Sequence, residues 1–333
     1  MNKKGLFAFI LFAFLGSIPA AQADYFYNIT VNTKSYDMSS SYIPQTVGAT
    51  GPWMGTSVNS VDFQIGPDPL NSVGSEITLR VDSTLQSDGI TWATSNPGVG
   101  IQFQLTTSPV ISGLISSSTA APTYPLTMTG YPTGGRSITI SGKLNLAYRL
   151  VRLLETVPAG KITPPSVYVT FYNTYDHAMY SGTMYSGAAK QPLYYPCTID
   201  APTEIKLPTL YVDDLVNGAQ GASSTYSIKL TNCPGAQNNI TYMYAPLYGA
   251  YGDGTQGYMY TATGEGSAKY VYLQLQNPDG TGQAVNNNIT LNNYTGSGDY
   301  TLPEFKVAYY IKDVNKATEG NVTSAIVIGI TYN

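Results

Sequence analysis

Short runs of alternating apolar and polar residues constrain this chain more than any other feature. They recur along its length and are separated by Gly, Pro, Asn and Asp. Alternation with period two places successive side chains on opposite faces of a strand, and the separating residues favour turns. Charged residues make up only 11% of the chain, and its 29 tyrosines favour strands over helices. The sequence therefore predicts an all-β protein of immunoglobulin-like Greek-key β-sandwiches.

The expected strands fall into two groups along the chain. The first group spans 25–32, 60–65, 76–83, 99–105, 124–130, 136–150 and 166–173. The second group spans 203–210, 225–232, 239–247, 268–276, 289–294, 305–313 and the terminal run 320–333. One segment, LAYRLVRLLET at 146–156, also fits a short helix.

The N-terminus has the pattern of a secretory signal peptide. Lys3 and Lys4 precede an apolar run over 6–15, and Ala21-Gln22-Ala23 supplies the small residues of a cleavage site. We expect residues 1–23 to be removed after Ala23. No later stretch approaches the roughly 20 apolar residues that span a bilayer, so we expect an exported chain without a membrane span.

The remaining length predicts two domains, because about 310 residues exceed one typical sandwich. Residues 186–196, SGAAKQPLYYP, have the composition of a connection, which gives an N-terminal domain over 24–190, a linker over 191–196 and a C-terminal domain over 197–333. The only cysteines are Cys197 and Cys233, 36 positions apart. In an exported chain they most simply form one disulfide, which would stabilise the C-terminal domain by ~4 kcal/mol in a loop-entropy model.

Charge and composition argue against several functional classes. The net charge is −4 and the sequence has no cluster of Lys and Arg, which argues against a nucleic-acid partner. A catalytic triad would depend wholly on His177, the single histidine. A glycosidase pair such as Asp82 with Asp88 stays open, although solvated surface is the usual explanation for sparse acids. We expect no enzyme activity, no cofactor and no metal site.

The end of the chain, GNVTSAIVIGITYN over 320–333, raises the question of what covers it. One face of this expected strand carries Val322, Ser324, Ile326, Ile328, Ile330 and Tyr332. No charge follows Glu319, and folded proteins normally cover, shorten or charge an apolar edge. The alternative is an ordinary central strand of a complete sandwich.

The residues of the second part resemble the pilin domain of chaperone-usher fimbriae. The likeness rests on CTID with IKLPTL behind it, on TYSIKLTNC closing at Cys233, and on GEGSAKYVYLQLQNPDG at 264–280. Its most specific mark is a glycine fourteen positions from the end with a penultimate aromatic, here Gly320 and Tyr332. In the first part, SNPGVGIQFQL and YRLVRLLETVPAGKI look like segments of tip-adhesin lectin domains, which would make 146–156 a strand.

The resemblance implies an incomplete C-terminal sandwich that lacks its last strand. A periplasmic chaperone would donate a strand first, and an adjacent fimbrial subunit would replace it after passage through an outer-membrane usher. The groove residues would be Gly320, Val322, Ile326, Ile328, Ile330 and Tyr332. An N-terminal domain in place of a donor arm resembles the two-domain tip adhesins, which places the protein at the fimbrial tip on the bacterial surface.

A receptor site would combine an aromatic ring with a few polar groups on loops at one end of the sandwich. Two loops qualify by composition. Residues 86–98 hold Asp88, Trp92 and Asn96, and residues 48–60 hold Trp53. For each tryptophan the alternative is a ring that packs the core, because tryptophan is highly buried on average.

The leading hypothesis is a non-enzymatic fimbrial tip adhesin that binds a host glycan or matrix protein. One alternative is a tip or initiator subunit that binds no receptor. Another is a secreted carbohydrate-active enzyme or binding module.

Overall fold

The computed structural model describes residues 24–38, 40–55, 61–67, 75–109, 111–114, 127–132, 138–174 and 176–333. Within these residues the chain is all-β, and its only helices are the short 3₁₀ turns η1, Val212–Asp214, and η2, Val314–Lys316. None of the described helices is long and apolar enough to cross a bilayer. The expected signal peptide, the end of the loop at 48–60 and the beginning of the strand at 124–130 lie outside the described residues.

The first unit, which runs from β1 to β11, contains two sheets around one hydrophobic core. One sheet has the order β1-β3-β9-β6-β5, and all its neighbouring strands are antiparallel. Its strands are Asp24–Val31, Val61–Pro67, Ile140–Arg152, Val99–Ser108 and Trp92–Ala93, in that order. The other sheet has the order β2-β11-β10-β4-β8-β7. Its strands are Lys34–Ser35, Met179–Ser186, Val167–Tyr172, Glu76–Val81, Thr127–Pro132 and Ile111–Ser112.

The segment that also fitted a helix is a strand. Residues 146–152 continue β9 and pair with β6, from Leu146 opposite Leu105 to Arg152 opposite Val99. The alternate side chains of β9 at 144, 146, 148 and 150 are buried in the core between the sheets. In a helix, residues two positions apart point in different directions, so these four side chains could not all face the core. The helix alternative is therefore wrong for 146–152.

The second unit contains three smaller sheets around a separate core. Their orders are β12-β14-β19, β13-β20-β17-β16 and β18-β15-β21. The first consists of Thr198–Asp200, Lys229–Cys233 and Gly298–Thr301; the second of Gly218–Gln220, Lys306–Ile311, Val271–Gln276 and Tyr258–Met259; the third of Ile289–Thr290, Ile240–Pro246 and Ile326–Tyr332. Both cysteines belong to this core and form the expected disulfide.

One expected strand is absent from the second unit. Residues 203–210 form no strand, although their side chains alternate between apolar and polar. The apolar members Ile205 and Leu207 are only partly buried and pack against the second core. Alternation thus reports one-sided burial here, but among the described residues no strand completes a ladder with this segment.

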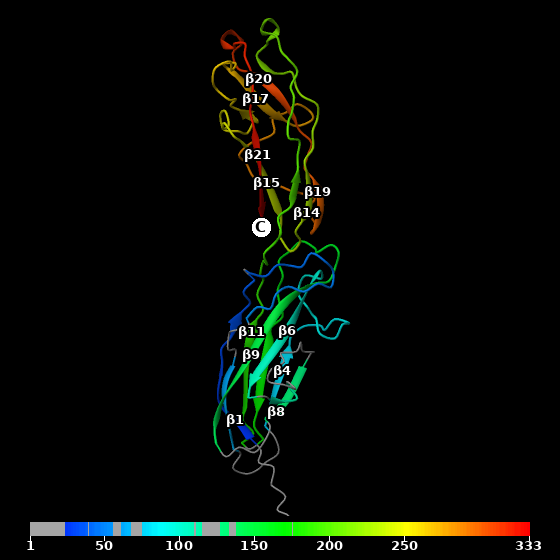
Figure 1. The fold of residues 1–333 in the computed structure, drawn as a ribbon, viewed down its shortest axis with the longest axis vertical. Helices are drawn as coiled ribbons and strands as arrows, with labels where there is room; N and C mark the ends of the chain where they lie inside the picture. The colour runs from blue at the N-terminus through cyan, green and yellow to red at the C-terminus, as the bar shows by residue number, and fades with distance from the viewer. Residues whose placement is uncertain are drawn as a thin grey trace, which may run out of the picture.

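The two units lie end to end, and β21 runs beside β15 in the second unit (Figure 1). A loop of the first unit joins them through backbone hydrogen bonds. The amide of Ala159 donates to the Thr295 carbonyl at 2.9 Å, and the amide of Gly160 donates to the Gln237 carbonyl at 2.7 Å. Ala236 of the second unit is fully buried in the core of the first. The junction is therefore packed and hydrogen-bonded.

Candidate functional site

The last strand of the sequence, β21, is paired along one edge. Its seven residues pair with β15 in antiparallel register, from Ile326 opposite Pro246 to Tyr332 opposite Ile240. In the described part of the chain no strand pairs with its other edge, because β21 ends the sheet order β18-β15-β21. A strand with one free edge carries backbone N–H and C=O groups that can bond to another strand.

The inward face of β21 is apolar and incompletely covered. Ile326, Ile328, Ile330 and Tyr332 pack against the second core, yet all four remain only partly buried. Val327, on the opposite face, is 57% exposed. Isoleucine in a closed core is usually almost fully buried, so this row has room for a further layer of side chains.

A groove of about 570 Å³ lies beside this row, with apolar residues toward the core and with the exposed side chains of Glu204 and Lys206 also on its lining. We define this apolar groove as the opening between two walls. Residues 201–207 form one wall, and residues 322–326 with Ile328 form the other. Its lining includes Leu273, Phe305 and Val307, which are core residues with no more than 6% of their surface exposed. The opening therefore reaches from the surface to the core of the second unit.

Only some of the groove residues expected from sequence line the apolar groove. Val322, Ile326 and Ile328 line the apolar groove. Ile330 continues the same face of β21 toward the end of the strand. Sequence reasoning missed the opposite wall, although the alternating Ile205 and Leu207 signalled a half-buried segment.

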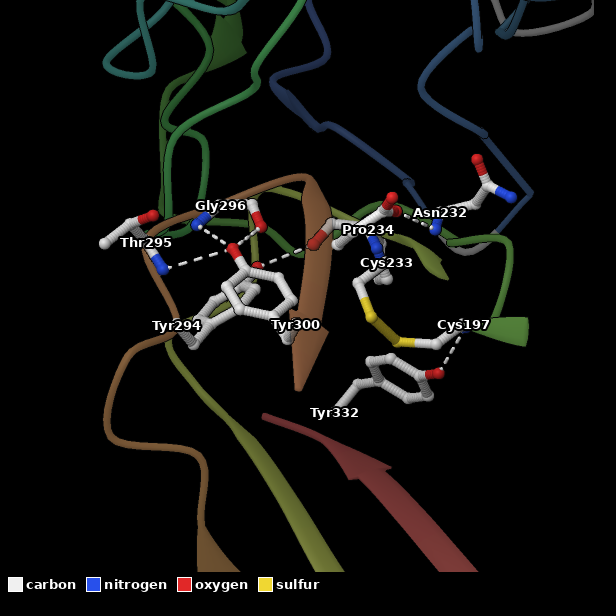
Figure 2. The surroundings of a disulfide bond; sticks show 10 residues. Cys197, Asn232, Cys233, Pro234, Tyr294, Thr295, Gly296, Tyr300 and Tyr332 are labelled. Carbon is white, nitrogen blue, oxygen red and sulfur yellow. Dashed lines mark hydrogen bonds between the residues drawn. A yellow bond between two sulfur atoms is a disulfide. The ribbon is translucent and has the colours of Figure 1, made fainter. Parts of the chain in front are cut away.

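Tyr332 ties the end of β21 to the disulfide. The Cys197 amide donates a hydrogen bond to the Tyr332 hydroxyl at 2.6 Å, as Figure 2 shows. The ring of Tyr332 lies against that of Tyr194, with centroids 4.3 Å apart. Burial raises the pKa of Tyr332 above its ordinary value. The penultimate aromatic thus anchors the terminal strand where the second unit begins.

Gly320 lies outside the apolar groove and shapes the approach to β21. Its φ is +142°, and a Cβ there would lie 2.4 Å from the amide nitrogen of Ala268. The neighbouring residue Asn321 bonds to Gly266 and Ala268 through its backbone. Only glycine allows the chain to pass so close to residues 266–268 in this conformation.

Two of the four expected receptor residues are buried. Trp92 has no exposed surface and packs in the first core, so the alternative of a core ring holds for it. Asn96 is 3% exposed, and its amide group donates to the carbonyls of Pro158 and Gly160 at 3.0 and 3.1 Å. Asn96 therefore supports the loop at the junction, and neither side chain is available to a receptor. The prediction was wrong for both because polar and aromatic loop residues can also serve packing.

The other two expected receptor residues are accessible and belong to one network. Asp88 is exposed and accepts hydrogen bonds from the amides of Ile90 and Thr91. Burial alone would raise the pKa of Asp88, but the hydrogen bonds from Thr91 and Ile90 outweigh it and lower that pKa. Trp53 is half-buried, with the guanidinium carbon of Arg149 4.4 Å from its ring centroid. Sequence reasoning missed Arg149.

The described residues contain no cluster of His, Cys, Asp and Glu that could hold a metal ion. His177 lies on the exposed turn after β10, where its ring contacts the Tyr172 hydroxyl at 3.1 Å.

Comparison with known proteins gives likenesses in structure. No protein-family model and no curated protein matches the sequence. The CupB6 tip adhesin from Pseudomonas aeruginosa is 14% identical, with 93% of this chain and 94% of that one covered and a TM-score of 0.42. The P pilus rod subunit PapA is 19% identical, with 42% and 100% covered and a TM-score of 0.31. The receptor-binding domain of the adhesin MrkD1P of Klebsiella pneumoniae is 11% identical, with 53% and 98% covered and a TM-score of 0.29.

The part of the chain that the structure describes is all-β, apart from two short 3₁₀ turns.

Proposed function

We propose that this protein is a fimbrial tip adhesin whose second unit is completed by a strand from another chain. The observation that carries the proposal is the free edge of β21 beside an apolar groove that opens onto the core. Together they offer an incoming strand both hydrogen-bond partners and a place for its side chains. The resemblance of the 264–280 and 320–333 segments to pilin domains supports the same assignment.

Strand addition would combine two favourable interactions. Backbone groups on the free edge of β21 would form a ladder with the incoming strand, which gives affinity independent of sequence. Every second side chain of that strand would enter the apolar groove and cover Ile326 and Ile328. Each large apolar side chain that becomes fully buried contributes roughly 1.5 to 3 kcal/mol. The groove thus selects a strand with apolar residues at alternate positions.

The resemblance to pilin domains of chaperone-usher fimbriae implies the partners. A periplasmic chaperone supplies the first strand, an outer-membrane usher mediates export, and an adjacent subunit supplies the final strand. Residues 197–333 would form the pilin domain, and residues 191–196 the linker. The first unit, residues 24–190, takes the place of a donor arm, which locates the protein at the distal end of the fimbria. There it binds a host glycan or a matrix protein through the surface that includes Trp53 and Asp88.

Thermal unfolding of the full chain with a synthetic strand peptide tests the groove. The peptide carries apolar side chains at every second position. We expect it to raise the unfolding temperature, since a ligand at 100 times its Kd stabilises the native state by about 2.7 kcal/mol. Ile328→Asp places a charge in the apolar groove and should abolish the shift.

Val327→Asp is the matched control, because Val327 is the adjacent residue of β21 and its side chain is exposed. This variant should respond to the peptide as the wild type does. An equal response from both variants, or no response from the wild type, would contradict strand addition at this groove.

A further inference from the structure

The outward face of the first sheet carries a row of polar and aromatic side chains across adjacent strands. Gln102 of β6 lies directly opposite Arg149 of β9. Met54 bridges to Tyr148, which brings Trp53 next to Arg149 on the other side. Leu85 forms a bridge with Trp92, and Trp92 pairs with Ile101 of β6. The 85–92 turn, which contains Thr91, therefore lies along the edge of β6 that faces away from β9, next to Gln102. Residues distant in the sequence thus form a continuous row.

Hydrogen bonds join this row in a single direction. The Arg149 Nε donates to the Gln102 Oε1 at 2.9 Å, and the Gln102 Nε2 donates to the Thr91 Oγ1 at 2.7 Å. The Thr91 hydroxyl then donates to the carboxylate of Asp88. Gln102 is 4% exposed and Thr91 is fully buried, so the packing holds both in place. The carboxylate at one end therefore fixes the orientation of the guanidinium at the other.

Arg149 uses only part of its hydrogen-bonding capacity in this row. An arginine has five N–H donors, and the described residues provide a partner for Nε alone. No carboxylate in the described part of the chain forms an ion pair with it. Arg152, three positions on, differs because its nitrogens donate to the carbonyls of Leu154, Glu155 and Pro44. Burial also lowers the pKa of Arg149, as expected of a cation taken partly from water without a counter-ion.

We propose that Arg149 and Trp53 form a subsite for a carboxylate-bearing sugar, an inference that rests on the adhesin function proposed above. The terminal nitrogens of a guanidinium form a planar fork that matches a carboxylate in two parallel hydrogen bonds. The Arg149 guanidinium lies over one face of the half-buried Trp53 ring, with its central carbon 4.4 Å from the ring centroid, so the other face or the edge of the indole would contact the apolar face of a sugar. The row contains no second cation, so a singly charged carboxylate fits better than a doubly charged phosphate monoester.

Binding of matched glycan probes to the full chain tests this subsite. The probes are lactose, the same disaccharide with a terminal N-acetylneuraminic acid, and a hyaluronan oligosaccharide whose carboxylates belong to glucuronic acid. We expect the wild type to bind at least one acidic probe more tightly than lactose, and the two acidic probes distinguish the kinds of sugar. Added salt should weaken this binding, because it screens the charge interaction.

Three arginine variants separate binding from folding. Arg149→Gln removes the charge and should lower the affinity for the acidic probe at least about tenfold. Arg149→Lys keeps the charge without the fork and should give an intermediate affinity. Arg80→Gln is the control, because Arg80 also lies over an aromatic ring, that of Tyr168 at 5.0 Å, but on the other sheet. It should bind as the wild type does. If Arg149→Gln fails to fold, Arg149→Lys carries the comparison.

The outcomes distinguish the subsite from the wider proposal. Wild-type affinity in both Arg149 variants would overturn the subsite. Binding to neutral glycans or to a matrix protein such as collagen, without any binding to the acidic probes, would also overturn the subsite. The proposed adhesin function would remain supported in that case. No binding to acidic glycans, neutral glycans or matrix proteins would remove support from the adhesin function itself, and the subsite with it.

Discussion

At the scale of single residues, glycines decide where two segments can touch. The terminal motif identified Gly320 from its spacing, but the spacing gave no physical reason for it. The structure supplies one, because φ is +142° and the amide nitrogen of Ala268 occupies the place of a side chain. This close approach connects the 266–268 turn to the segment that leads into β21. Gly320 thus positions the strand that borders the apolar groove without lining it.

Gly320→Ala should therefore destabilise the second unit strongly. A side chain in such a backbone conformation costs about 1 to 3 kcal/mol, and the collision with Ala268 adds to it. Gly298→Ala is a matched control, because its φ is +152° but no atom lies within 4 Å of the added Cβ. Denaturant unfolding of both variants measures the difference. Equal free energies of unfolding for the two variants would contradict this prediction, because they would show that Ala268 can move away from the added Cβ without loss of stability.

Trp92 and Asn96 show the limit of sequence reasoning at this scale. Both lie in the 86–98 segment, which has the composition of a binding loop, although Trp92 belongs to β5. Whether such a side chain faces solvent depends on what crosses it in space, and residues 158–160 and the first core cover these two. Arg149 shows the reverse, because its role depends on Gln102, Trp53 and Asp88, which lie far apart in the sequence.

At the scale of elements, period-two alternation predicted the long strands well. The expected runs at 99–105, 239–247 and 166–173 correspond to β6, β15 and β10. The signal is reliable there because each strand buries one face against a core. The same signal gave a strand at 203–210, where the structure has an extended wall of the apolar groove. Alternation reports the burial of one face and contains no information on whether the backbone has a partner.

Short strands could not be predicted from the sequence. Elements such as β2, β5 and β16 contain two residues each, too few to show a period. They exist because a longer neighbour offers free backbone groups, as β6 does for Trp92 and Ala93. Tertiary pairing thus determines them. The free edge of β21 has the same origin, because only the complete topology shows which strand ends a sheet.

At the scale of the whole molecule, each of the two separate cores contains buried tyrosines with a raised pKa. Burial raises the pKa of Tyr36 and Tyr185 in the first core and of Tyr244 in the second. A folded-state pKa above the unfolded value means that the native state retains protons that the unfolded chain releases. The resulting stability is fully present below the unfolded pKa of about 10 and is lost as pH rises through the folded pKa.

We therefore expect the free energy of unfolding to fall as pH rises above about 10. Each buried tyrosine that stays protonated lowers it by about 1.4 kcal/mol per pH unit. Denaturant unfolding between about pH 8 and pH 11 measures the slope. Tyr244→Phe removes one of these phenols and should make the slope smaller. A stability that does not change over this range would contradict the burial of the tyrosines in the folded state.

The two units differ in how completely this chain covers their cores. The first has a core whose largest side chains, Trp92, Tyr36 and Phe26 among them, are fully buried within the chain itself. The second has a core that opens into the apolar groove. Its stability should depend on a partner strand, whereas that of the first should not. This asymmetry fits a protein that displays one unit and is attached through the other.

Amide hydrogen exchange along β21 tests the central claim most directly. In an antiparallel strand, amides that bond to the partner alternate with amides that point away from it. For the full chain alone, we predict that the amides bonded to β15 exchange slowly and that the alternate ones exchange quickly. Addition of the alternating strand peptide should slow this second set at least about tenfold, and a scrambled peptide should not. Protection of both sets without the peptide, or no change on its addition, would contradict the account.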